Sequence, residues 1–229
     1  MKTLKVTLEL LSDTLSGSGE GFGAMIDTDV QYDEFGIPFI SAKRIKGCLK
    51  NSLHDLLEMP AVSDNKFQGQ SEAERKESRK EIIEKVFGKA GAVNSTSFAI
   101  GDFLLEDHEA IKTWFAYLIE KYPGIFSSEK ILSAFTNTRK QTKIGNDEVA
   151  EPHSLRTSRV VNRGIKLETD ICFEEEDKEV EGLLALSCAN LRRIGTKRNR
   201  GLGDVRCELI GDIVSLAIND LEKSTLRER

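Results

Sequence analysis

The sequence predicts an α+β fold in which a sheet carries its helices on one face. Segments with the two-residue alternation of strands recur along the chain, and helical segments separate them. The strand–helix–strand units are short, and long polar insertions interrupt them. This order is expected of a ferredoxin-like sheet within a single domain spanning residues 1–229. Insertions of such length in a compact domain are usually functional or disordered.

The N-terminal part contains one strand, one long loop and one helix. Apolar and polar residues alternate over residues 2–11, which predicts a strand. Residues 12–29 are rich in Gly and Ser and predict a loop. A helix is expected over residues 41–59, where Ser41 is a plausible N-cap and leucines form an apolar stripe.

The middle of the chain begins with an insertion over residues 60–95, which is polar and charge-dense and includes a solvated helix that closes at Gly88. Residues 96–105 predict a strand. Residues 107–124 predict a helix with Asp107 as its cap, because a Pro-Gly pair stops the pattern at its end.

The C-terminal part begins with an insertion over residues 130–160 that has few apolar residues and many basic ones. A strand is expected over residues 158–174, a helix over 177–195 and a further strand over 204–211. A glycine-rich basic loop joins this helix to the last strand.

Charge is distributed unevenly along the chain. The net charge is −5, yet residues 138–166 hold Arg139, Lys140, Lys143, Arg156, Arg159, Arg163 and Lys166 against Asp147, Glu148 and Glu151. Local basic patches of this kind attract phosphate whatever the overall charge. No apolar run is long enough to span a bilayer and no signal peptide is recognisable, so we expect a cytoplasmic protein with no membrane partner. The four cysteines are scattered in apolar settings, which favours buried thiols over a zinc site.

The loop "RRIGTKRNRGLGDV", residues 192–205, is the strongest local indication of function. Glycines allow a backbone to approach an anion closely, and cations bind it. The loop is neither a Walker loop nor a dinucleotide-binding fingerprint, because a helix precedes it and a strand follows it. Two interpretations remain open: a loop that contacts an RNA or DNA backbone, and a helix C-cap at Gly195 followed by a solvated turn.

Cations also gather where the first helix begins, in "SAKRIKG", residues 41–47. Lys43, Arg44 and Lys46 are electrostatically unfavourable at a helix N-terminus unless an anion is present. Their position therefore favours phosphate binding over a merely solvated face.

Three blocks in order resemble the RAMP superfamily of RNA-binding CRISPR proteins. They are "GSGEGFGAMIDTDVQYDEFGIPFISAKRIKGCLKNSL", residues 17–53, "TRKQTKIGNDEVAEPHSLRTSRVV", residues 138–161, and the glycine-rich loop. The second block resembles the thumb of the type III effector backbone subunits. The resemblance implies a modified RNA-recognition-motif sheet with a thumb hairpin in the 130–160 insertion.

The resemblance also implies a function. A backbone subunit of a type III effector complex binds the sugar-phosphate backbone of guide RNA. It cleaves the paired target RNA with a divalent cation such as Mg²⁺. Its partners would be guide RNA, target RNA, other effector subunits and further copies of itself. Two alternatives stay open: a non-catalytic RAMP subunit that scaffolds or caps guide RNA, and a stand-alone endonuclease that processes guide RNA.

Site residues carry over from the resemblance position by position. The catalytic and metal-binding aspartate falls on Asp27, with Asp29 as its rival, and either could instead stabilise a turn. The expected RNA contacts are Lys43, Arg44, Lys46, Arg139, Lys143, Arg156, Arg159, Gly195, Lys197, Arg198, Arg200, Gly201 and Gly203.

Overall fold

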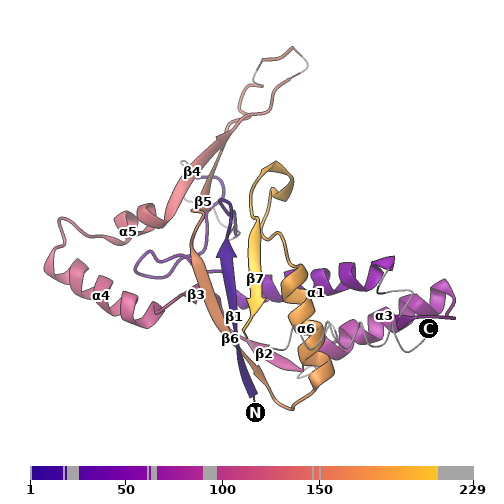
Figure 1. The fold of residues 1–229 in the computed structure, drawn as a ribbon. Helices are drawn as coiled ribbons and strands as arrows, with labels where there is room; N and C mark the ends of the chain where they lie inside the picture. Colours follow the sequence, from indigo (N-terminus) through magenta and orange to yellow (C-terminus); the bar gives the residue numbers. More distant parts are fainter. Residues whose placement is uncertain are drawn as a thin grey trace.

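The structure is a computed structural model that describes residues 2–17, 19, 26–60, 62, 66–89, 97–145, 147–149 and 151–210. Parts of the predicted 12–29 loop and of the 60–95 insertion, and the end of the predicted 204–211 strand, lie outside these residues. The fold is mixed α/β with antiparallel sheets, as the sequence predicts at this level (Figure 1).

The main sheet is built around a central strand, β1 (Lys2–Leu10). It pairs antiparallel with β6 (Lys166–Phe173) on one side and β7 (Val205–Leu209) on the other. The order along the sheet is β2-β6-β1-β7, where β2 spans Phe98–Ile100, and the short β3 (Leu104–Leu105) also pairs with β6.

Two predicted strands are divided in the structure. The 96–105 segment forms β2 and β3, with Gly101, Asp102 and Phe103 between them. The 158–174 segment was expected to be one strand, but it contributes to two sheets. A turn at Gly164, with φ 85°, separates β5 (Arg156–Val161) from β6. An alternation pattern does not register such a turn, because apolar residues continue on both sides of it.

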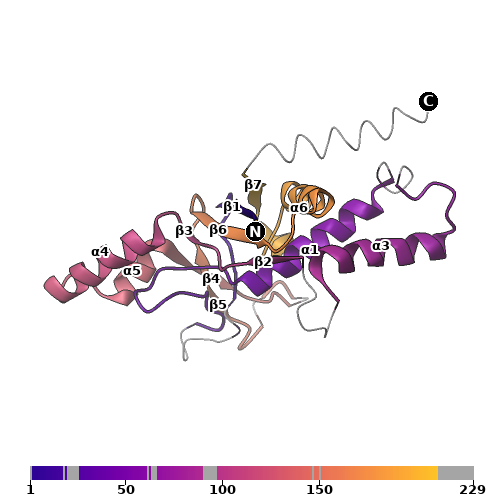
Figure 2. The ribbon, with the colours of Figure 1, turned by 90° about the horizontal axis from the view of Figure 1, so that it is seen from below.

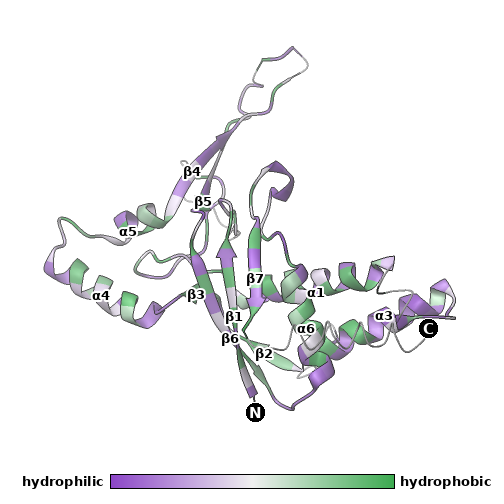
Figure 3. Ribbon diagram, in the orientation of Figure 1, coloured by the Kyte–Doolittle hydropathy of each residue, from purple (hydrophilic) through white to green (hydrophobic). Residues whose placement is uncertain are grey.

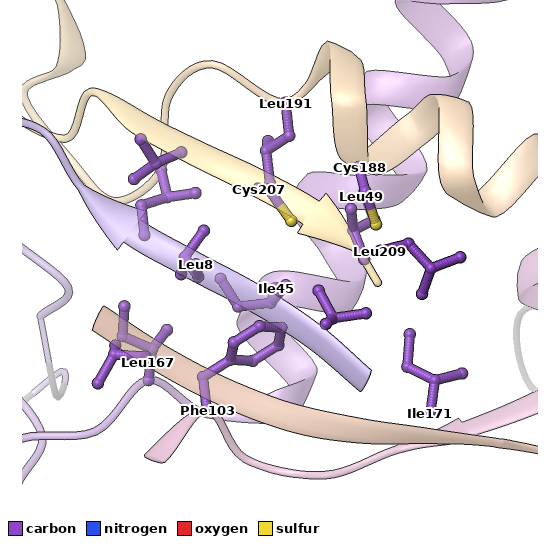
Figure 4. Packing of buried hydrophobic residues seen from close by; sticks show 14 of the residues in the cluster. Leu8, Ile45, Leu49, Phe103, Leu167, Ile171, Cys188, Leu191, Cys207 and Leu209 are labelled. Atoms are coloured by element: carbon purple, nitrogen blue, oxygen red, sulfur yellow. The ribbon is translucent and has the colours of Figure 1, made fainter. Parts of the chain in front are cut away.

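The main sheet packs its core through one face. Val6, Leu8 and Leu10 of β1 are buried, while the intervening side chains are half or fully exposed, as the two-residue period of a strand requires. Helices α1 (Ala42–Glu58) and α6 (Lys178–Asn190) supply the other side of the core. Figure 4 shows Ile45 and Leu49 of α1 and Cys188 of α6 in the same cluster as strand residues.

The two core helices are joined by hydrogen bonds between buried serines. Ser52 Oγ donates to the Ser187 carbonyl at 2.8 Å, and Ser187 Oγ donates to the Leu49 carbonyl at 2.6 Å. Both hydroxyls are thereby satisfied inside the core, which avoids the cost of burying an unpaired polar group.

Helix α3 (Glu72–Phe87) confirms the helix predicted to close at Gly88. Ser71 and Glu74 form a capping box at its start. Ile83, Val86 and Phe87 in its last turns are buried, so this end of the helix joins the core beside α1 and α6.

Helices α4 (His108–Lys121) and α5 (Ser128–Phe135) form an arm on the opposite side of the sheet from α1 and α3 (Figure 2). Helix α4 starts where the sequence predicts, but Asp107 does not cap it with its side chain. Asp107 has φ 57° and its side chain makes no capping hydrogen bond. Helix α5 has no counterpart in the predicted element order. Its residues Ile131 and Leu132 are buried, so packing against the rest of the protein stabilises it.

A two-stranded hairpin of β4 (Thr136–Gln141) and β5 projects from the body of the molecule (Figure 1). Its strands pair from Thr136↔Val161 to Gln141↔Arg156. At the base, Val160 and Val161 are buried, so they belong to the core. Towards the tip, Ile144, Val149 and Leu155 are exposed.

We predict that proteases cut the isolated protein first between Lys143 and Arg156 and that RNA protects this segment. The exposed tip has little apolar burial to oppose local opening, whereas the base is held by the core. Limited trypsin digestion with and without RNA, followed by mass spectrometry, measures the order of cuts. Equal cleavage rates with and without RNA would contradict the prediction.

Candidate nucleic-acid interface

Three of the predicted functional segments meet at the base of the hairpin. The loop segment at Thr28 runs beside β5, since Thr28 bridges Ser158 in parallel and the Arg159 amide donates to the Thr28 carbonyl at 3.0 Å. From the glycine-rich loop, Lys197 Nζ donates to Ser158 Oγ at 3.2 Å. Residues distant in sequence thus share one small region around Ser158.

Asp27 is held in place by the backbone of β5 but remains accessible. Its Oδ2 accepts from the Thr157 amide at 2.7 Å, and its own amide donates to the Thr157 carbonyl at 2.9 Å. The side chain is 44% exposed, and Arg156 Nη1 lies 3.8 Å from Oδ1. One carboxylate oxygen is therefore fixed, and the other lies beside a cation.

Asp29, the rival aspartate, is part of the folded framework. Its side chain is 6% exposed and forms an ion pair with Arg159 at 3.2 Å. Its other oxygen accepts from the Val30 amide at 2.8 Å. Both carboxylate oxygens are thus engaged within the protein, which distinguishes Asp29 from Asp27.

The glycine-rich loop is a tight excursion that closes on itself. Helix α6 ends at Asn190, several residues before the predicted end at Gly195. The Ile194 amide donates to the Gly203 carbonyl and the Val205 amide to the Arg192 carbonyl, each at 2.9 Å. Between these bonds lies the short 3-10 turn η1 (Arg198–Arg200). In Figure 3 this loop and β4 are largely hydrophilic, whereas α6 is mainly hydrophobic.

The three glycines predicted to contact RNA differ in what confines them. All have positive φ: 77° at Gly195, 74° at Gly201 and 79° at Gly203. A Cβ at Gly195 would overlap the Leu15 carbonyl, and one at Gly203 would overlap the Ile194 carbonyl, whereas Gly201 faces open space. The protein's own backbone therefore confines Gly203, so a side chain at this position would disturb the fold itself.

The cations of the loop differ in their partners. Arg193 is paired with Asp204 at 2.9 Å. Arg198 and Arg200 are exposed and have no carboxylate partner within the described residues. Burial raises the pKa of the Cys48 thiol, and the nearby Arg198 and Arg44 oppose that rise. Arg198 of the loop and Arg44 of α1 therefore lie near the same point.

The three cations at the start of α1 point to different surroundings. Lys43 is exposed, and Arg44 Nη2 donates to the Gly17 carbonyl while its buried Nε has no partner within the described residues. Lys46 lies over the Phe98 ring at 5.4 Å, away from the loop, and burial followed by the Lys50 charge lowers its pKa. An acid that the sequence did not reveal, Asp102, accepts from the Ala42 amide at 2.7 Å and supplies an anion to this helix end.

Four basic residues of the hairpin lie near a carboxylate. Besides the pairs of Arg156 and Arg159, Arg139 pairs with Asp13, and Lys143 pairs with Glu151 at 2.8 Å. Exposed pairs of this kind contribute little to stability and are screened by salt. Arg139, Lys143 and Arg156 can therefore exchange their carboxylates for phosphates, whereas the Arg159 side chain is only 18% exposed and pairs with the buried Asp29.

Within the described part of the chain, no group of three or more His, Cys, Asp or Glu side chains is placed to hold a metal ion. Asp27 is an exposed carboxylate where these segments meet. Mg²⁺ is often held by one or two carboxylates, with water and substrate phosphates completing its shell. Asp27 fits that mode of binding and does not fit a metal cage made by protein alone. Over the same described ranges, no helix is long and apolar enough to cross a membrane.

The chain is similar to a known protein family and to solved structures. A model of the RAMP superfamily matches residues 7–206. One similar solved structure is a chain of the type III-B Cmr-beta complex bound to cognate target RNA, with TM-score 0.63 and 15% identity over 93% of this chain and 99% of that chain. A chain of the same complex in its apo state gives TM-score 0.61 and 14% identity over 93% of this chain and 98% of that one. No curated protein matches the sequence.

We predict that Gly203→Ala lowers the free energy of unfolding by about 2–4 kcal/mol, because it adds a backbone overlap to an unfavourable φ. The matched control Gly201→Ala has the same sign of φ but open space, and should cost about 1 kcal/mol. Denaturant unfolding of both variants measures the difference. Equal losses would show that the Ile194 carbonyl does not confine Gly203.

We also predict that Arg198→Gln and Arg200→Gln together weaken RNA binding and leave thermal stability nearly unchanged. The two side chains are exposed, so their loss should not disturb the core. For single-stranded RNA, each phosphate that they no longer neutralise should make the negative slope of log K against log salt shallower by about 0.7. Lys80→Gln on α3 is the control, since its ammonium pairs with Glu77 on that helix. Unchanged binding by the double variant would mean that the loop is a turn with incidental charge.

Proposed function

Because the chain belongs to the RAMP superfamily, we propose that it is a subunit of a type III CRISPR effector complex that binds guide RNA along its backbone. The similarity to chains of a type III-B complex, one of them bound to target RNA, supports this assignment. The exposed cations of the glycine-rich loop, Arg198 and Arg200, support it as well. Guide RNA, target RNA and further effector subunits would be its partners.

We further infer a ferredoxin-like core of the modified RNA-recognition-motif type. The order β2-β6-β1-β7, with antiparallel neighbours and with α1 and α6 as the two crossover helices, supports this finer description. The exposed side chains of β1 and β6 include Thr3, Lys5 and Asp170 rather than the aromatic rings with which an RNA-recognition motif stacks bases. RNA is therefore expected at the loop end of the sheet and not across its face.

The proposed reaction is metal-dependent cleavage of target RNA beside Asp27. The observation that carries it is the Asp27 carboxylate, which the Thr157 amide fixes and which lies exposed where the glycine-rich loop and hairpin meet. A divalent cation bound there would neutralise developing charge on the phosphate. Asp27 would hold that cation with its second carboxylate oxygen, and Arg156 would bind the neighbouring phosphate oxygens.

We predict that Asp27→Asn abolishes target cleavage, with a loss of at least about a hundredfold, and leaves guide binding intact. The asparagine oxygen can still accept from the Thr157 amide, so stability should change by less than about 1 kcal/mol. Cleavage of labelled target RNA by the purified effector complex, with and without EDTA, measures the effect.

Asp29→Asn is the contrasting variant. It removes the charged partner of the largely buried Arg159 side chain and should cost about 3 kcal/mol of stability. If complexes carrying Asp27→Asn still cut at every site, the subunit is a non-catalytic scaffold or cap for guide RNA. Metal-independent cutting of guide precursor by the lone chain would instead identify a processing endonuclease.

A further inference from the structure

Ser158 is a buried hydroxyl whose hydrogen-bond partner is a lysine. The residue is 2% exposed, on the strand β5 that also provides the Thr157 amide to Asp27. Its Oγ accepts from Lys197 Nζ at 3.2 Å. Buried polar atoms are normally hydrogen-bonded, and here the partner comes from the glycine-rich loop.

Lys197 is held in an unusual conformation. Its φ of 57° lies in the left-handed region, which is unfavourable for a residue with a side chain. Such residues cluster at functional sites, where the surrounding structure compensates for the strain. The Arg200 amide donates to the Lys197 carbonyl at 2.9 Å, so the η1 turn fixes the backbone from which the side chain reaches Ser158.

The Lys197 ammonium lacks an anion within the described part of the chain. It is half-buried, and its hydrogen-bond partner there is the neutral hydroxyl of Ser158. An ammonium has three donors, so two remain for a ligand. A half-buried cation without a negative partner is costly, and a phosphate oxygen would offset that cost.

Other polar atoms near the loop point to the same kind of ligand. Buried Ser16 Oγ and Arg44 Nε have no hydrogen-bond partner within the described residues. Ser16 lies between two residues whose carbonyls accept hydrogen bonds from α1 and from the loop. The Gly17 carbonyl accepts from Arg44 of α1, and the Leu15 carbonyl accepts from the Thr196 amide of the loop. The segment at residues 15–17 thus adjoins both the loop and α1, and polar atoms beside it are left without a partner among the described residues.

We propose that Ser158 is a positioning residue that directs the Lys197 ammonium to the RNA phosphate lying beside Asp27. Ser158 is adjacent in sequence to Thr157, which fixes Asp27, so β5 sets the positions of the cation and the carboxylate together. The loop thereby holds the RNA backbone in register with Asp27. This inference rests on the proposed RNA-binding function.

The test compares two substitutions of similar shape. Ser158→Thr retains the hydroxyl and Ser158→Val removes it. Both add a methyl group at a buried position, so strain from added volume affects them alike. The full chain is titrated with single-stranded RNA at several salt concentrations, and its effector complex is assayed for target cleavage at saturating RNA.

We expect Ser158→Val to lower the cleavage rate about tenfold to a hundredfold and to reduce the salt slope of binding by about 0.7, the value for one phosphate. Ser158→Thr should remain close to the parent. Lys197→Met should show the same reduction in salt slope, and combining it with Ser158→Val should add nothing further.

Equal behaviour of the Val and Thr variants in salt slope would overturn the role of Ser158, whatever the cleavage result. Additive losses in the double variant would do the same, because the two groups would then act separately. If the parent complex binds RNA but does not cut it, the cleavage proposal fails while the salt slopes still decide the role of Ser158. Melting temperatures of both Ser158 variants show whether a loss reflects unfolding.

Discussion

The antiparallel pairing of β1 with β6 and β7 determines where everything else in the molecule lies. Glu9 pairs with Lys166 at the start of β6, and Leu10 pairs with Val205 at the start of β7. The C-terminal end of β1 and the N-terminal ends of β6 and β7 therefore lie at the same end of the sheet. The N-terminal loop, the hairpin and the glycine-rich loop all connect to the strands at that end, and this is why they meet.

The same strand pairing sets where charges are paired and where they are not. On the exposed face of the sheet, Lys5 pairs with Glu168 at 2.8 Å and Arg206 with Glu9 at 3.1 Å, so opposite charges sit across neighbouring strands. At the loop end, Arg198 and Arg200 have no carboxylate partner within the described residues. Positive charge can thus gather at the loop end of the sheet although the chain as a whole has a net charge of −5.

Packing inside the protein and the proposed contact with RNA place different demands on the glycine-rich loop. Gly195 and Gly203 let the loop pass close to the Leu15 and Ile194 carbonyls, so they serve the fold. Arg198 and Arg200 stand outside that packing and are free to bind a ligand. Lys197 belongs to both groups, since its strained backbone shapes the turn and its ammonium reaches β5.

The sequence by itself determined the elements whose signal is local. Alternation placed β1, an apolar stripe placed α1, and a charged helical pattern closing at Gly88 placed α3. Composition also marked the loop and hairpin as basic. These signals depend on residues a few positions apart, so no knowledge of the fold was needed.

Only the tertiary structure decided which of these residues are exposed and which are buried. The resemblance pointed to Asp27 and kept Asp29 as a rival, and the structure adds that Asp27 is exposed beside β5 whereas Asp29 is buried against Arg159. The contacts of Asp102 and Ser158 and the division of the 158–174 segment were equally hidden. Each depends on a partner far away in sequence, and such pairings arise only when burial of one sheet face brings the strands together.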